Sequence, residues 1–248
     1  MRDTTKATAL WQASPMGGAL IGAEAELLRT TLDDVYGLEL LQLGRWGAER
    51  QLMQASRLRR QSLVAEAAAG ESSPDIVASL NRLPIGTGLI DAVLLPHSLE
   101  TEPDPHAVLR EADRVLGGEG QLVVLGFRPI SLWGLRSLTS DCGYPPGLRR
   151  HLSEHRVRDW LVLLGFEITL MRRYLYAWPG AYREAPEPQS LLKRGLLRPW
   201  PAGAYLIKAR KHTYALTPIR PRRAERRARI GALVEPSILE GGSGGEIL

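Results

Sequence analysis

The sequence contains a single cysteine, Cys142, among its 248 residues. One cysteine excludes a disulfide bridge within the chain, which fits a reducing compartment. Long apolar runs are also missing: IDAVLLPHSL and WLVLLGF are shorter than the roughly 18 residues that a membrane-spanning helix needs. The N-terminus is weakly apolar and contains Asp3, so it makes a poor signal peptide. We therefore expect a cytoplasmic protein without a membrane span.

Several catalytic signatures are absent as well. The sequence has no G-x-S-x-G elbow, no phosphate-binding P-loop and no C-x-x-C pair, so hydrolase, nucleoside triphosphatase and dithiol redox chemistries lack their parts. HLSEH (His151 to His155) matches the H-x-x-E-H pattern of some zinc peptidases. That pattern needs both histidines on one helix, whereas Ser153 is placed to cap a helix that excludes His151. We expect no metal site.

Basic residues are concentrated near the C-terminus. The segment from Lys208 to Arg229 holds nine Lys or Arg and one Glu, a balance of +8, so the rest of the chain carries 5 − 8 = −3. Residues 212–248 contain arginine clusters and GGSGGE and cannot bury much surface, which predicts a solvated, disordered tail. The alternative is a tail that tethers the protein to RNA or to another anionic partner. Nucleic-acid binding is expected only through this tail.

Periodic apolar positions predict the secondary structure. They indicate helices over 24–35, 104–116 and 154–164, and strands over 38–44, 89–96, 121–127, 166–177 and 204–211. Residues 58–69 fit either a strand or an alanine-rich helix. Strands that alternate with helices predict an α/β fold with a mostly parallel sheet, and the last two strands, without a helix between them, predict an antiparallel hairpin at one edge.

A family resemblance appears from residue 83 onward. Leu83-Pro84-Ile85, Ile90-Asp91, the apolar run to Leu95, His97, the helix PHAVLREADRVL and the strand GQLVV follow one another. This series resembles the type-11, ubiquinone/menaquinone-methyltransferase-like branch of the class I S-adenosylmethionine (SAM)-dependent methyltransferases. VRDWLVLLGFE is similar to the junction between that family's helix E and strand 6. The likeness covers roughly 24–211, with 1–23 as an N-terminal extension and 212–248 as the tail.

The resemblance implies a Rossmann-like, seven-stranded sheet with order 3-2-1-4-5-7-6, an antiparallel strand 7 and helices on both faces. It also implies SAM as cofactor and a methyl acceptor that the sequence does not identify. In such sheets the ligand lies outside the carboxyl ends of the strands, at the switch point between strands 1 and 4.

The loop after the first strand is the expected cofactor loop. The family has (D/E)-x-G-x-G-x-G there, and this chain has Gln42, Gly44, Trp46 and Gly47 within QLGRWG. Gln42 can hydrogen-bond but cannot pair with the SAM ammonium group as a carboxylate would. Trp46 either closes over the cofactor or fills its space. Two interpretations stay open: an altered cofactor loop with a degenerate motif, or a structural turn.

Other cofactor contacts follow from the same alignment. Glu66 lies 22 residues after Gly44, where an acidic residue holds ribose hydroxyls, but it would be a solvated helix residue if 58–69 were helical. Ser79 and Leu80 occupy the adenine-contacting position before Leu83. Leu95 lies at the end of the fourth strand, beside the expected crevice.

His97 follows the fourth strand and is the expected catalytic residue. As a neutral imidazole it would accept a proton from the acceptor or hold a substrate oxygen. The alternative is a histidine packed under a loop, and Glu100 is placed either to orient it or to face solvent. Two functions therefore stand: a SAM-dependent methyltransferase, in which positioning supplies most of the catalysis, or a catalytically inactive methyltransferase-like binding protein.

Overall fold

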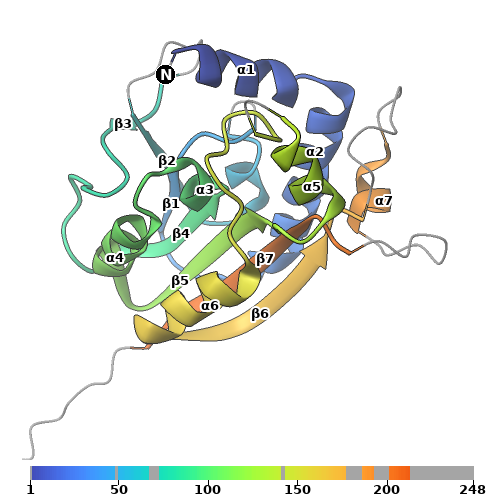
Figure 1. Cartoon of the computed structure of the whole chain (residues 1–248). Helices are drawn as coiled ribbons and strands as arrows, with labels where there is room; N and C mark the ends of the chain where they lie inside the picture. The colour runs from blue at the N-terminus through green and yellow to red at the C-terminus, as the bar shows by residue number, and fades with distance from the viewer. Residues whose placement is uncertain are drawn as a thin grey trace, which may run out of the picture. The chain divides into compact units, whose positions relative to one another are not determined.

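The computed structural model describes residues 2–47, 50–66, 73–140, 143–176, 186–192 and 201–212 (Figure 1). All of them belong to one compact unit, Met1–Thr213. The predicted disordered tail lies outside the described residues, apart from His212. Within the described residues, no helix is long and apolar enough to cross a membrane.

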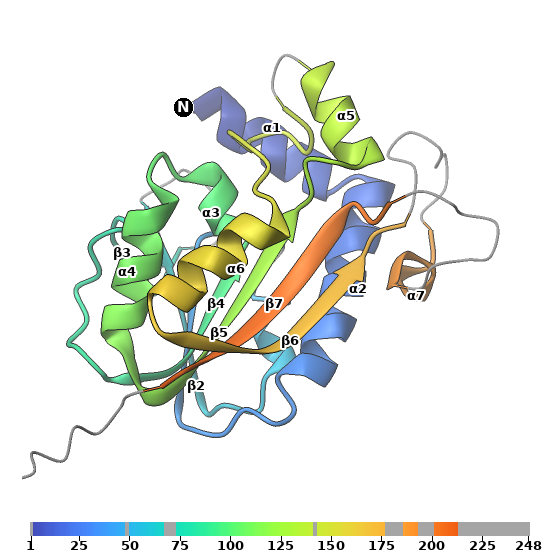
Figure 2. The same cartoon turned by 60° about the horizontal axis from the view of Figure 1, so that its bottom comes forward.

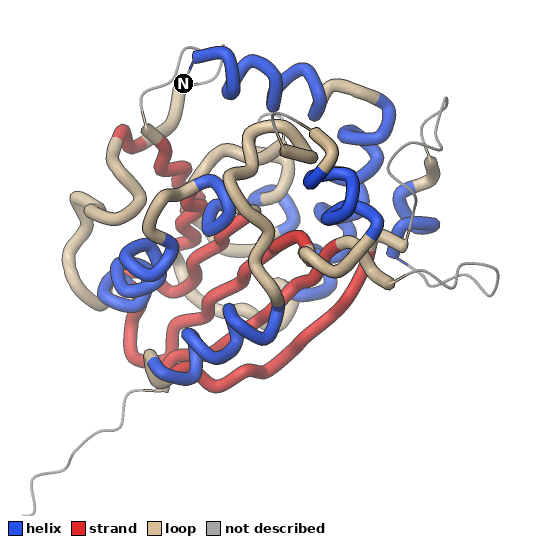
Figure 3. Tube along the Cα trace, viewed as in Figure 1, coloured by secondary structure: helices blue, strands red, loops and turns tan. Residues whose placement is uncertain are grey.

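A seven-stranded sheet forms the centre of this unit (Figure 3). Its order is β3-β2-β1-β4-β5-β7-β6, in which β7 runs antiparallel to β5 and β6 and the other neighbouring pairs are parallel. The strands are β1 (Glu39–Leu43), β2 (Arg60–Ala65), β3 (Ile76–Val77), β4 (Ile90–Pro96), β5 (Leu116–Phe127), β6 (Phe166–Tyr174) and β7 (Ala204–Lys211). The fold class, the strand order and the edge hairpin predicted from the sequence are confirmed.

Helices cover both faces of the sheet (Figure 2). In that view α2 and α7 lie on one face, and α4 and α6 lie on the other. The helices are α1 (Arg2–Gln12), α2 (Pro15–Thr31), α3 (Ser98–Thr101), α4 (Pro105–Val115), α5 (Leu132–Leu138), α6 (Glu154–Leu163) and α7 (Pro188–Leu192), with a 3-10 turn η1 (Met53–Ala55).

Alternating side chains of the strands divide the core into two layers. On β4, Ala92 and Leu94 belong to the layer beneath α2, whereas Val93 and Leu95 belong to the layer beneath α4 and α6. Parallel strands covered on both faces bury successive residues on opposite sides, which explains the continuous apolar run of this strand.

The structure decides the local alternatives. Residues 60–65 form β2, so the strand interpretation of 58–69 is confirmed and Glu66 directly follows a strand. Helix α4 begins at Pro105, and Asp104 caps it by accepting a hydrogen bond from Ala107 N at 3.0 Å. Ser153 caps α6 and leaves His151 outside it, as predicted.

The helix predicted over 24–35 was wrong in its bounds. Helix α2 begins at Pro15, where the Ser14 side chain accepts a hydrogen bond from Gly17 N, and it ends at Thr31. The apolar stripe extends back to Met16, so the helix starts earlier than its most periodic part. The expected boundary after residue 23 therefore falls inside a helix. The helix predicted over 104–116 ends at Val115, and the GGEG that follows it lies within β5.

Candidate functional site

The candidate site lies where β1 and β4 end side by side. Gln42 of β1 is in register with Leu94 of β4, at the point where the strand order reverses. The following loop turns at Gly44 (φ 90°) and Gly47 (φ 79°), a left-handed backbone that favours glycine. Both glycines of the predicted loop therefore shape the turn.

Gln42 is buried, and only one of the two polar atoms of its side-chain amide forms a hydrogen bond among the described residues. Its Nε2 donates a hydrogen bond to Gly44 O at 3.0 Å, whereas its Oε1 is buried and has no hydrogen-bond partner in the described part of the chain. A buried acceptor without a donor costs free energy, so such atoms mark places where an outside donor fits.

Gly44 is the meeting point of the loop with two other elements. Ser98, at the start of α3, donates a hydrogen bond to Leu43 O. A Cβ added at Gly44 would lie 2.6 Å from Ser98 Oγ and 3.5 Å from Leu80 Cδ1. The structure thus brings Gly44 and Leu80 close together and adds Ser98, which the sequence reasoning did not single out.

Glu66 and Ser79 also lie together. Ser79 Oγ is 3.4 Å from Glu66 Oε1 and 3.0 Å from Asn81 Oδ1. Glu102, which follows α3, interacts electrostatically with Glu66: burial and the charge of Glu66 raise the pKa of Glu102. Leu95 is different, because it is fully buried in the layer beneath α4.

Trp46 lies on the other face of the sheet from Leu80. Its indole is buried in the layer beneath α2, and its Nε1 donates to Glu24 Oε2 at 2.7 Å. The ring centroid is 4.4 Å from the ring of His97. Trp46 therefore does not stand between Gly44 and Leu80.

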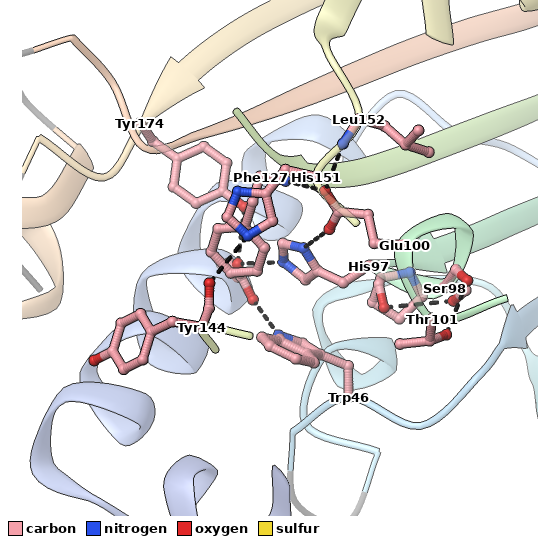
Figure 4. Close-up of polar contacts among 12 residues, drawn as sticks. Trp46, His97, Ser98, Glu100, Thr101, Phe127, Tyr144, His151, Leu152 and Tyr174 are labelled. Atoms are coloured by element: carbon pink, nitrogen blue, oxygen red, sulfur yellow. Dashed lines mark hydrogen bonds and ion pairs between the residues drawn. The ribbon is translucent and has the colours of Figure 1, made fainter. Parts of the chain in front are cut away.

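His97 is the centre of a buried polar cluster with Glu24 of α2 and Glu100 of α3, here called the charged hub. Its Nε2 is 2.9 Å from Glu24 Oε1, and its Nδ1 is 3.1 Å from Glu100 Oε2. All three side chains are at most 1% exposed. Figure 4 shows His97 between Trp46 and Glu100, with the ring of Phe127 beside it; Phe127 stacks on His97 at 4.2 Å.

Further donors complete the hub. Tyr174 of β6 donates from its hydroxyl to Glu24 Oε1 at 2.8 Å, and Phe127 N donates to Glu100 Oε1 at 2.8 Å. Burial lowers the pKa of His97, but the charges and hydrogen bonds of the two glutamates outweigh it and raise that pKa from 6.5 to about 9. Burial and the Glu24 charge raise the pKa of Tyr174 well above its usual value, so its hydroxyl keeps its proton.

The backbone of His97 is itself unusual. Its φ of 57° and ψ of 12° place it in the left-handed region, which few residues other than glycine adopt and in which histidine is enriched. This turn starts α3 directly after β4 and brings Glu100 back to the ring. Sequence reasoning considered Glu100 as an orienting residue, and the structure contains that contact.

Glu24 and Tyr174 were missed. A signal for Glu24 was present, because it is four residues from both Leu20 and Leu28 on the apolar stripe of α2. A carboxylate on a buried helical stripe requires buried partners. No comparable signal marks Tyr174, which comes from a strand 150 residues away in the chain.

Comparison with known proteins identifies the family. A family model described as a methyltransferase domain, of type 11, matches residues 18–124. The protein YafS of Escherichia coli K12, whose function is uncharacterized, is 33% identical over 173 residues, which are 69% of this chain and 70% of YafS. This chain belongs to the class I SAM-dependent methyltransferases. The resemblance seen in the sequence is confirmed.

Solved methyltransferase structures share the fold. A chain from the complex between the Haloferax volcanii Trm112 methyltransferase activator and a proposed methyltransferase matches with a TM-score of 0.61 and 14% identity, over 86% of this chain and 98% of that one. A SAM-dependent methyltransferase from Aquifex aeolicus matches with a TM-score of 0.51 and 16% identity, over 84% and 97%. At 14% and 16% identity these structures show the fold of this chain and no more.

Proposed function

We propose that this methyltransferase binds SAM at the carboxyl ends of β1, β2 and β4 and transfers its methyl group to a small-molecule acceptor. The observation that carries the proposal is the unpartnered Oε1 of Gln42, which is buried beside the glycine turn. This atom occupies the position where the family has a carboxylate, and it offers an acceptor to the SAM ammonium group.

The neighbouring residues fit the rest of the cofactor. The carboxylate of Glu66 is exposed beside Ser79, so both can bind ribose hydroxyls. Leu80 offers an apolar side chain to the adenine ring, and Gly44 and Gly47 form the turn of the loop. Leu95 belongs to the layer beneath α4, and we place Trp46, which belongs to the layer beneath α2, as the wall residue on that side of the cofactor.

Methyl transfer needs little acid–base chemistry from the protein. SAM, when bound, would supply an activated methyl group, whose carbon the acceptor would attack in line while the carbon–sulfur bond breaks and SAH leaves. Both ring nitrogens of His97 face carboxylate oxygens, so we assign His97 a positioning role in which it holds Glu24, Glu100 and the wall residue Trp46 in place.

Titration calorimetry with SAM and with S-adenosylhomocysteine (SAH) tests the proposal. Gln42→Ala removes the free acceptor, and we expect roughly tenfold weaker SAM binding from the loss of one buried hydrogen bond to a charged group. Gln61→Ala is the matched control. Gln61 is a half-buried glutamine near the start of β2, away from the carboxyl ends of the strands, and its Nε2 donates to Ser56 O and Leu58 O. If neither compound gives a heat of binding or raises the melting temperature, SAM binding is refuted.

A second candidate is a methyltransferase-like binding protein without turnover. Two features favour it. Gln42 is neutral, and Ser98 lies close to Gly44, so it occupies space beside the loop that a bound cofactor would need. On this alternative Gln42→Asp strengthens SAM binding while purified protein transfers no labelled methyl group to any cell extract. Tight SAM binding by the wild type together with transfer to an extract component excludes it.

A further inference from the structure

The geometry of the charged hub determines its net charge. Each of the two contacts between a ring nitrogen of His97 and a carboxylate oxygen needs one proton, whichever atom carries it. A ring without protons and two carboxylates together carry −3, and two protons bring this to −3 + 2 = −1. Trp46 and Tyr174 contribute neutral donors. The hub therefore holds one negative charge.

Within the part of the chain that the structure describes, Glu24 and Glu100 form ion pairs with His97, and neither carboxylate forms one with a Lys or Arg side chain. The rings of Trp46 and Phe127 pack against the imidazole and exclude water from it. An isolated buried charge is costly, and a cation bound nearby offsets the cost.

The hub lies beside the proposed cofactor loop. Ser98, the residue after His97, touches Gly44, and Trp46, two residues after Gly44, touches the ring of His97. Gln42 and Leu40 alternate with Leu41 and Leu43 along β1, so Gln42 points to the α2 face, where the hub lies. An unpartnered acceptor and an unpaired negative charge therefore occur on one face of the same strand ends.

We propose that the charged hub makes the site selective for a cationic cofactor: it favours SAM, with its positive sulfonium, over the neutral thioether of the product SAH. This proposal rests on SAM binding as proposed above. Glu24 and Glu100 act through the field of the hub, so they are specificity-determining residues that need no direct contact with the cofactor. The hub supplies the negative charge that the neutral Gln42 lacks.

The experiment is the ratio of SAM to SAH affinity in hub variants, measured by calorimetry at one ionic strength. The double variant Glu24→Gln/Glu100→Gln removes both carboxylates and, with a neutral His97 ring, takes the hub from −1 to zero; the one remaining ring N–H then faces an amide NH2 group. We expect its SAM to SAH preference to fall roughly tenfold, as one unit charge acting across a buried site would produce. The ratio of the two affinities is the quantity to compare, because both compounds carry the same ammonium and carboxylate groups and differ in charge only at the sulfur.

The single variants are matched controls with an opposite expectation. In Glu24→Gln the amide oxygen must face the Trp46 indole N–H, so its NH2 group faces His97 Nε2. In Glu100→Gln the oxygen must face Phe127 N, so its NH2 group faces Nδ1. Each single variant then expels one proton from the ring and keeps the net charge at −1. Its SAM to SAH ratio should stay within about twofold of the wild type.

A second neutral variant keeps the test valid if the double variant does not fold. Glu24→Met/His97→Asn/Glu100→Met replaces the ionic cluster by mostly apolar groups and keeps a residue that tolerates the left-handed backbone at position 97. Any neutral variant that binds SAH and keeps the wild-type ratio overturns the proposal. A wild type that binds neither SAM nor SAH refutes the proposed function instead.

Discussion

At the scale of single residues, Glu24 explains why a charged hub persists in an apolar core. Its two oxygens accept hydrogen bonds from the indole of Trp46, the ring of His97 and the hydroxyl of Tyr174 at 2.7 to 2.9 Å. Hydrogen bonds to an ionised acceptor are stronger than neutral ones, and they compensate for part of the lost hydration. Glu24 therefore both fixes the position of Trp46 and carries part of the buried negative charge.

The protonation of His97 should make the stability of the folded protein depend on pH. Its pKa is raised from 6.5 to about 9 in the folded protein, so its contribution to stability is fully present below pH 6.5 and is lost as the pH rises through 9. We expect the free energy of unfolding in urea to fall by up to about 3 kcal/mol over this interval. The control His106→Gln, on the exposed surface of α4, should leave the fall unchanged.

Nitrogen NMR of histidine-labelled protein locates the same proton. We expect one of the five histidines to keep both ring nitrogens protonated at pH 7.5, and that signal to vanish in His97→Asn. Stability that rises between pH 6.5 and 9, or a neutral His97 ring at pH 7.5, would contradict the assignment of the proton.

At the scale of elements, α2 precedes β1 in the chain but supplies the cover for the sheet face next to the site. Between β1 and β2 the described residues contain only the 3-10 turn η1, although two parallel strands are usually joined through a helix. The start of α2 is packed against the end of α1, whose Trp11 ring lies 6.0 Å from Trp46. The position of α2 therefore decides where both Glu24 and the wall residue lie.

Two adjacent glycines at the start of α2 test this packing. A Cβ at Gly17 would lie 2.2 Å from Trp11 O, whereas a Cβ at Gly18 has nothing within 4 Å. We expect Gly18→Ala to stabilise the protein by about 0.5 to 1 kcal/mol through helix propensity, and Gly17→Ala to destabilise it by about 1 to 3 kcal/mol. Urea unfolding measures both, and equal effects of the two substitutions would show that α1 is not packed as described.

How much of this was predictable from the sequence depends on the range of the interactions. The strands, the caps at Asp104 and Ser153 and the loop at Gly44 follow from local periodicity and turn chemistry, so they could be predicted. The hub could not, because its members come from α2, the β4 end and β6. The direction in which Trp46 points also depends on Glu24, which lies 22 residues earlier.

At the scale of the whole molecule, β7 is the strand that makes the described unit one body. It pairs with β5 along one edge and with β6 along the other, and the described unit extends to Thr213, just after β7 ends. Lys208 of this strand donates to Thr31 O at 2.9 Å, so β7 also ties the end of α2 to the sheet. A C-terminal segment is thus required for the position of an N-terminal helix.

Truncation tests this dependence. A chain that ends at Thr213 keeps all seven strands, and we expect its melting temperature and its SAM affinity to equal those of the full chain. A chain that ends at Gly203 lacks β7 and should not fold. If the basic segment after Thr213 binds RNA, that binding should be salt-sensitive and should disappear in the first truncation. A loss of melting temperature in the first truncation would contradict the assigned boundary.

The bond between Glu24 and Tyr174 also sets an order of events during folding. The two residues are separated by 150 positions, so Glu24 leaves the ribosome long before its partner is synthesised. Contacts between distant segments pay a large loop-closure cost and form late. Until β6 is in place, α2 carries a carboxylate on its apolar face, and we expect that charge to hinder collapse of the helix onto an incomplete sheet.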